Sequence, residues 1–267
     1  MIREPAVAGR FYPSDVRELS RQILHYSPST ATRVRALGCI VPHAGYMYSG
    51  HVAGAVFSAL ELPERFIILC PRHYPEGQAL AILSEGAWRT PLGEAAVDSE
   101  LAVDLKRACN LLHEDSAAHR HEHSLEVQLP FLQKLKGNFR FVPIALGTDR
   151  FASFESLGRA IADVIAQHAE PIMIVASSDM NHYEPDEVTR VKDRKAIERI
   201  LALDPRGLYD TVRREGITMC GYGPAVTMLT AAKQLGATKA DLVRYATSGD
   251  VSGDRDEVVG YAGIVVM

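Results

Sequence analysis

Runs of consecutive apolar residues alternate along the chain with stretches in which apolar residues recur every three or four positions. The uninterrupted runs predict buried strands, whereas the periodic stretches predict helices with one apolar face. The strands predicted in this way span residues 37–42, 65–71, 79–83, 140–146, 172–178, 241–247 and 260–266. Because helices are predicted between most of them, the pattern favours a largely parallel sheet that is covered on both faces.

The helices are recognised by their apolar spacing and by the residues at their ends. They are predicted around residues 52–60, 99–108, 125–135, 154–165, 188–203, 207–215 and 224–235. Pro130 must kink the third helix or divide it into two, because proline lacks the amide hydrogen that a helix needs. No repeat and no linker rich in glycine, proline or serine interrupts the series, so we expect a single domain over residues 1–267.

Three of the predicted strands lead directly into a histidine or an aspartate. His43 and His73 follow the first two strands, and Asp179 follows the strand at 172–178, with His182 three residues further on. In open α/β sheets, ligands bind outside the carboxyl ends of the strands. We therefore expect these side chains to face one pocket and to form a metal site or an acid/base site.

Each of these residues also has a simpler interpretation. Alone, His43 or His73 is explained by a histidine that satisfies loop backbone groups, and Asp179 by a helix cap or a turn before Pro185. As a pair on strands that we expect to be adjacent, the two histidines are better explained as neutral imidazole ligands. Asp179 would then bind the metal, orient a ligating imidazole or act as a general base.

Residues 119–126 contain the densest group of histidines in the chain, namely His119, His121 and His123. These side chains would share one face only if the segment were extended. The segment also lacks the HExxH pattern of zinc proteases. We interpret His119 and His121 as solvated residues ahead of a helix and leave the role of His123 open.

The four cysteines are Cys39, Cys70, Cys109 and Cys220, and their spacing excludes a zinc ribbon or a thioredoxin-type motif. Cys39 and Cys70 lie within apolar strands, where a free cysteine acts as a small buried hydrophobic residue. Cys220 instead precedes a predicted helix, whose amino-terminal end favours the thiolate form. Of the four, only Cys220 is placed for chemistry.

Composition and charge narrow the range of partners. The 267-residue chain has a net charge of −4 and a pI of about 6.2, which gives no basic surface for nucleic acid or anionic lipid. Its first residues form no apolar segment, and no apolar run approaches the roughly 18 residues that a membrane-spanning helix needs. We expect a cytoplasmic protein without nucleic acid or membrane partners. Glycine-rich nucleotide motifs and the serine hydrolase motif are absent from the sequence.

Five short segments, spread over almost the whole chain, carry a resemblance to a known family. They are REPAVAGRFYP at 3–13, PHAGY at 42–46, EHSLE at 122–126, SSD at 177–179 and MCG at 219–221. In this order they resemble the Memo family, whose microbial members are called AmmeMemoRadiSam system protein B. That family is similar to class III extradiol dioxygenases, the non-haem iron enzymes that cleave catechol rings. The resemblance implies a three-layer α/β/α sandwich with a largely parallel or mixed central sheet.

The resemblance also implies a set of site residues. They are His43, His73 and Cys220 as metal ligands, with Asp179, His182 and His123 lining the same pocket as catalytic residues. Ring-cleaving relatives use two histidines and a carboxylate, so Cys220 departs from the dioxygenase pattern. A thiolate favours the redox metals iron and copper, or zinc.

Three functions remain open at this point. In the first, iron or copper supports an oxygen-dependent reaction on a small molecule or a modified residue. In the second, the pocket has lost turnover and binds a peptide or a phosphopeptide. In the third, zinc-bound water serves a hydrolase. The naming of the family also suggests a functional link to a radical S-adenosylmethionine enzyme.

Overall fold

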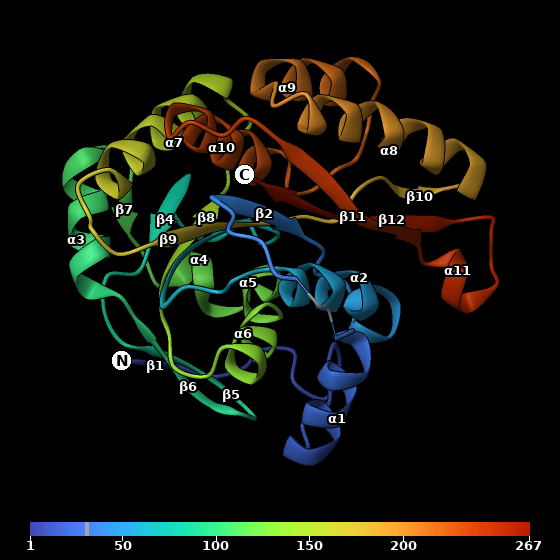
Figure 1. The fold of residues 1–267 in the computed structure, drawn as a ribbon, viewed down its shortest axis with the longest axis horizontal. Coiled ribbons are helices and arrows are strands. Elements are labelled where there is room, and N and C mark those ends of the chain that lie inside the picture. Colours follow the sequence, from blue (N-terminus) through green and yellow to red (C-terminus); the bar gives the residue numbers. More distant parts are fainter. Residues whose placement is uncertain (30–31) are drawn as a thin grey trace.

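In the part of the chain that the structure describes, twelve strands form one mixed sheet between two layers of helices (Figure 1). The computed structural model describes residues 1–29 and 32–267. Its strands are β1 (Ile2–Arg3), β2 (Gly38–Val41), β3 (Arg65–Pro71), β4 (Leu80–Ile82), β5 (Ala87–Thr90), β6 (Gly93–Val97), β7 (His113–Glu114), β8 (Arg140–Leu146), β9 (Ile172–Ser177), β10 (His182–Glu184), β11 (Ala240–Thr247) and β12 (Val258–Val266). The seven strands predicted from the apolar runs correspond to β2, β3, β4, β8, β9, β11 and β12.

The helices that flank the sheet are α1 (Val16–Tyr26), α2 (Tyr46–Ala59), α3 (Ser99–Ala108), α4 (Ala117–Arg120), α5 (His123–Glu126), α6 (Leu129–Leu135), α7 (Phe151–Ile165), α8 (Asp186–Leu201), α9 (Pro205–Arg214), α10 (Tyr222–Gln234) and α11 (Gly249–Ser252). Buried side chains of α3 and α7 to α10 form a core on one face of the sheet, and those of α1, α2, α5 and α6 form a core on the other. This arrangement confirms the predicted three-layer α/β/α sandwich. Pro130 lies in the first turn of α6, so the helix predicted at 125–135 is divided into two.

The centre of the sheet is parallel and its margins are largely antiparallel. Strands β6, β8, β3, β9 and β2 lie side by side in this order, and each pairs in parallel with the next. Beyond them, β12 pairs antiparallel with β2, β10 and β11. The expectation that His43 and His73 follow adjacent strands is wrong, because β9 lies between β2 and β3. Crossover connections allow a strand that comes later in the chain to lie between two earlier ones.

Both faces of the central strands are buried, which explains why these strands are apolar without alternation. On β2, Ile40 belongs to the core that contains α7 and α10, whereas Cys39 and Val41 belong to the core that contains α2. Cys39 and Cys70 are fully buried, as the apolar runs predict. With both faces covered in this way, the polar side chains of these strands are concentrated where the strands end.

The apolar pattern does not predict the elements at the margins of the fold. These are the short strands β1, β5, β6, β7 and β10 and the helices α1, α4 and α11. The strands have two to five residues, which is too short for a period to be recognised. In α1 only Leu19 and Ile23 are buried, so its apolar face is narrow.

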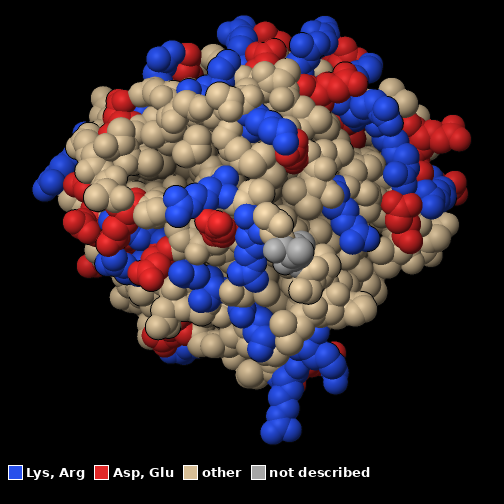
Figure 2. Space-filling model, viewed as in Figure 1, with Lys and Arg blue, Asp and Glu red and all other residues tan. Residues whose placement is uncertain are grey.

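The surface carries charges of both signs. Over the upper half of the face shown in Figure 2, Lys and Arg side chains are interspersed with Asp and Glu side chains. Many of them form exposed ion pairs such as that between Lys239 and Asp241, which contribute little to stability. Among the described residues, no helix combines the length and the apolar character needed to cross a bilayer.

One buried carboxylate holds the amino-terminal segment against α5. Glu126 is fully buried and forms an ion pair with Arg3. It also accepts hydrogen bonds from the amides of Ala6 and Val7, at 2.8 and 3.1 Å, and from the Tyr12 hydroxyl at 2.6 Å. Because a buried charge is tolerated only when it is paired and hydrogen-bonded, these contacts fix residues 3–12 relative to α5.

We expect the Glu126→Ala substitution to lower the free energy of unfolding by about 3–5 kcal/mol, because it leaves Arg3 as a buried charge without its partner. Urea denaturation followed by circular dichroism measures this change. As a matched control, Asp241→Ala removes an exposed ion pair and should cost less than about 1 kcal/mol. Equal effects of the two substitutions would contradict the role assigned to Glu126.

Candidate metal centre

Polar side chains that follow three neighbouring strands lie at one end of the sheet. Strands β2, β9 and β3 run in parallel, and His43, Asp179 and His73 each lie two residues beyond the last residue of their strand. All three residues line one cavity of about 560 Å³. The structure therefore places them together as predicted, while their chemical roles remain predictions.

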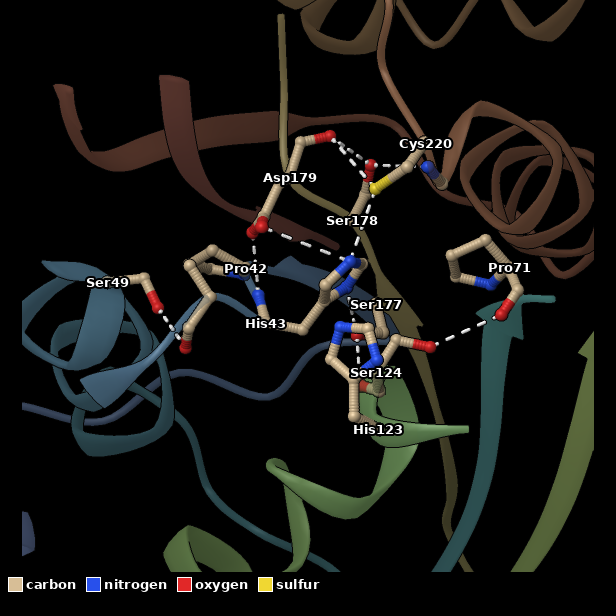
Figure 3. A network of polar contacts seen from close by, with 12 residues as sticks. Pro42, His43, Ser49, Pro71, His123, Ser124, Ser177, Ser178, Asp179 and Cys220 are labelled. Atoms are coloured by element: carbon tan, nitrogen blue, oxygen red, sulfur yellow. Dashed lines mark hydrogen bonds and ion pairs between the residues drawn. The ribbon is translucent and has the colours of Figure 1, made fainter. Parts of the chain in front are cut away.

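The other three predicted site residues reach the same cavity from different elements. His123 is the first residue of α5, His182 begins β10, and Cys220 lies two residues before α10. All three line the cavity, and Figure 3 shows His123 and Cys220 on either side of His43. Residues that are far apart in sequence thus meet in one place.

Three imidazole rings converge in this cavity. One ring nitrogen from each of His43, His73 and His123 lies within 4.8 Å of the other two. The ring centroids are 5.3 Å apart for His43 and His73, 5.6 Å for His43 and His123, and 4.8 Å for His73 and His123. Imidazole nitrogens gathered in this way can bind one zinc, copper or iron ion, so His123 joins the candidate ligands.

Glu122 fixes both the backbone and the ring of His73. Its fully buried carboxylate accepts hydrogen bonds from the His73 amide at 2.6 Å and from Nδ1 of the His73 ring at 2.9 Å. Ser124 donates to the same carboxylate through its amide and its hydroxyl. A carboxylate on one ring nitrogen leaves the other available to a metal, as in many metal sites.

The hydrogen bonds of Glu122 also determine its charge. Burial opposes ionisation of this carboxyl, but the hydrogen bonds and charge of His73 and the hydrogen bond from Ser124 outweigh burial and lower the pKa of Glu122 to about 2. In return, burial would lower the pKa of His73, but its contacts with Glu122 raise it. A metal at the remaining nitrogen of His73 would therefore compete with a proton.

His43 lies deeper and makes contacts at both ring nitrogens. Its Nδ1 is 2.9 Å from the hydroxyl of Ser177, and its Nε2 is 3.2 Å from Sγ of Cys220 (Figure 3). The nearer carboxylate oxygen of Asp179 to this nitrogen is 3.9 Å away. The His43 side of the cavity thus combines an imidazole, a thiol and a carboxyl.

Burial and mutual repulsion favour the neutral forms of His43, His123 and His182, in contrast to His73. Burial, followed by the positive charges that His73, His123 and His182 would carry, holds the pKa of His43 well below its usual value. Burial likewise lowers the pKa of His123 to about 4 and that of His182 by a smaller amount. A neutral imidazole has the free lone pair that a metal ligand or a base requires.

Asp179 has the pKa of a group that exchanges protons near neutral pH. Burial raises the pKa of its carboxyl to about 7, although hydrogen bonds from the amides of His43 and Ala44 partly oppose the rise. A carboxyl with this pKa is partly protonated and partly ionised at pH 7. It is therefore suited to accept or donate a proton.

Cys220 differs from its predicted behaviour. It lies just before α10 as predicted, but burial and the nearby Asp179 carboxyl raise the pKa of its thiol well above the usual value. The expectation that the helix start favours a thiolate is therefore wrong for the metal-free cavity, because burial outweighs the helix dipole. A bound metal cation would act in the opposite direction.

His182 is held by a small polar network beside the cavity. Its amide donates to the hydroxyl of Thr218 at 2.7 Å, and its Nδ1 lies 3.0 Å from the carbonyl oxygen of the same residue. Asn181, which is fully buried, accepts two hydrogen bonds from Thr218 at 3.1 Å. These contacts join the segment after β9 to the segment that carries Cys220.

The prediction for His119 is wrong, whereas His121 is exposed as predicted. His119 is fully buried and packs edge to face against Trp88, with ring centroids 5.7 Å apart. Its polar sequence neighbours suggested solvation, but the ring is buried against Trp88 of β5. The sequence alone predicts no role for Glu122 or Ser177, because their contacts with His73 and His43 form only in the folded chain.

Comparison with known proteins identifies the family. The sequence profile of the family described as "Memo-like protein" matches residues 3–265, almost the whole chain. The chain belongs to the Memo family. The resemblance to this family that the sequence segments suggested is therefore confirmed.

Similar proteins of the Memo family occur in several microorganisms. A "MEMO1 family protein" of Methanopyrus kandleri is 45% identical over 280 residues, which cover 99% of each chain. Another, from Methanothermobacter thermautotrophicus, is 42% identical and covers 98% of this chain and 99% of its own. The crystal structure of an uncharacterized protein from Escherichia coli K12 covers 86% of this chain and 100% of its own, with a TM-score of 0.61 and 14% identity. At that identity the likeness shows the fold alone.

We expect the Glu122→Gln substitution to remove a pH-dependent part of the stability of the metal-free protein. The folded-state pKa of Glu122 is depressed to about 2, so its stabilising effect is present above the unfolded pKa and is lost as pH falls. The stability advantage of the wild type over the variant should shrink by about 2 kcal/mol between pH 5 and pH 3. Urea denaturation at several pH values measures it, and a constant advantage over this range would contradict the ionised state of Glu122.

Proposed function

We propose that this Memo family protein holds iron or copper between His43, His73 and Cys220 and oxidises a small molecule or a modified residue with oxygen. When bound, the metal would supply the redox chemistry that a reaction with oxygen requires. The chain would bind the metal, position the substrate in the cavity and move protons.

His43 and His73 carry this proposal, because each ring is fixed at Nδ1 and keeps Nε2 available. A buried oxygen lies 2.9 Å from Nδ1 in both cases, from Ser177 for His43 and from Glu122 for His73. Support of this kind at the second ring nitrogen is typical of metal-binding histidines. Two such rings beside a thiol fit a transition metal better than they fit an apolar ligand.

Cys220 and His123 compete for the third ligand position. Sγ of Cys220 is 3.2 Å from Nε2 of His43, and a thiolate at this position suits iron or copper. The ring of His123 has a weaker support, since its Nδ1 is 3.5 Å from Glu122. We therefore assign Cys220 as the ligand and His123 as an acid/base residue.

Asp179 and His182 are the residues that we assign to proton transfer. With a pKa of about 7, the Asp179 carboxyl can take up or release a proton at neutral pH next to His43. His182 faces a carbonyl oxygen at Nδ1, so this nitrogen carries the hydrogen and Nε2 is the one that accepts a proton. Both residues line the cavity in which a substrate would lie.

Two other functions could use the same residues. With zinc, the site would serve a hydrolase, and Asp179 would accept a proton from water. Without turnover, the cavity would bind a peptide or a phosphopeptide, and Tyr183, 71% exposed, would offer an aromatic surface at the cavity lining. The cytoplasmic location and the functional link to a radical S-adenosylmethionine enzyme also remain predictions.

We expect the His43→Gln and His73→Gln variants to lose stoichiometric metal, because each removes one of the two best supported ligands. Metal per chain is measured by mass spectrometry after anaerobic loading with iron, copper or zinc and removal of excess. The His121→Gln variant is the matched control, since His121 is an exposed histidine outside the cavity, and it should bind as the wild type does. Full metal retention in the His43 variant would contradict the proposed site.

Oxygen uptake separates the proposed function from its alternatives. Protein loaded with iron or copper should consume oxygen in the presence of a substrate drawn from catechols or peptides, and the His43→Gln variant should not. Hydrolysis by the zinc form alone would favour the hydrolase. Peptide binding that is unchanged by metal removal, without oxygen uptake, would favour the binding module.

A further inference from the structure

A network of buried hydrogen bonds surrounds Nδ1 of the His43 ring. The hydroxyl oxygen of Ser177 lies 2.9 Å from Nδ1 of His43, 2.6 Å from the carbonyl oxygen of Ser124 and 2.9 Å from Nε2 of Gln128. Ser124, Ser177 and Gln128 are fully buried, and His43 is 2% exposed. Because these groups are buried, the donors and acceptors of each group determine which atom donates in each hydrogen bond.

Gln128 can only donate to Ser177. Its Nε2 also lies 2.9 Å from the carbonyl oxygen of Pro42, which has no hydrogen to offer. If the amide were turned around, two oxygen acceptors would face each other at this distance. The amino group of Gln128 therefore points toward both Pro42 and Ser177 and donates one hydrogen to each.

The single hydrogen of the Ser177 hydroxyl is also used in a hydrogen bond. The carbonyl oxygen of Ser124, 2.6 Å away, can only accept, so the hydroxyl hydrogen must lie between these two oxygens. Ser177 then has no hydrogen left for His43. The remaining contact, between Ser177 Oγ and His43 Nδ1, is a hydrogen bond only if Nδ1 carries the hydrogen.

We propose that Ser177 is a positioning residue that fixes neutral His43 in the tautomer with its hydrogen on Nδ1. The lone pair of His43 then lies on Nε2, the nitrogen that faces Cys220 at 3.2 Å. The contact with Cys220 agrees, because a thiol can donate a weak hydrogen bond to this lone pair. Ser124 and Gln128 orient Ser177, and Ser177 in turn orients the ring.

This role rests on the proposed function in one respect, namely that Nε2 of His43 binds a metal. The tautomer itself is a property of the metal-free chain and is measured without metal. We therefore suggest long-range proton–nitrogen correlation spectra of protein labelled with nitrogen-15 in the histidine rings, recorded at neutral pH. The His43→Gln variant identifies the His43 signals by their loss.

The expected wild-type spectrum shows His43 with its hydrogen on Nδ1. In Ser177→Ala the acceptor is gone, so the His43 signals should shift toward the tautomer with hydrogen on Nε2. Iron, copper or zinc should bind this variant about 10- to 100-fold more weakly, as expected when the group that orients a ligand is removed. In Ser177→Thr the hydroxyl is retained, so both the tautomer and the metal affinity should be restored.

Thr227→Val is the matched control for removal of a buried hydroxyl. Thr227 is fully buried on α10, and its hydroxyl has no hydrogen-bond partner among the described residues, so the His43 signals should not move. Wild-type His43 with its hydrogen on Nε2, or an unchanged His43 signal in Ser177→Ala, would overturn the proposal. A wild-type protein that shows the expected tautomer but binds no metal would contradict the proposed function and support the assignment of Ser177.

Discussion

A fully buried carboxylate at the start of α5 determines how the cavity is assembled. Glu122 binds both the amide and the ring of His73, so the loop after β3 and the start of α5 cannot move independently. One turn later, Glu126 binds the amino-terminal segment, and Phe11 from that segment lies against the ring of His123, with centroids 4.7 Å apart. A buried carboxylate is tolerated only when its oxygens are hydrogen-bonded. The side of the cavity formed by His73 and His123 therefore depends on these two carboxylates.

The burial that orders the site also sets its electrostatics. It lowers the pKa of His43 and raises the pKa values of Asp179 and Cys220, so all three groups are driven toward their neutral forms. A cation in the cavity would lower the pKa values of the Asp179 carboxyl and the Cys220 thiol, whereas the neutral imidazole of His43 already has the form that binds it. A bound cation would stabilise the ionised forms of Asp179 and Cys220, whereas a bound anion would destabilise them. This difference is the physical reason for proposing a metal rather than an organic anion as the ligand.

The strand ends could be predicted from the sequence because parallel strands share one edge, and His43, His73 and Asp179 follow their strands at the same distance. The order of the strands could not, since no local pattern shows that β9 lies between β2 and β3. The contacts of Glu122 could not be predicted either, because they depend on how α5 packs against the loop after β3. His119 shows the reverse error, in which polar neighbours suggested exposure for a residue that is fully buried.

The identity of the atoms around a bound metal is the most direct test of the central claim. X-ray absorption spectroscopy of protein loaded anaerobically with one equivalent of iron or copper should show imidazole nitrogens together with one sulfur. The sulfur contribution should disappear in Cys220→Ser, and the imidazole contribution should fall in His43→Gln. A spectrum with oxygen neighbours only, or one that is the same in the wild type and in His43→Gln, would contradict a metal site built on His43, His73 and Cys220.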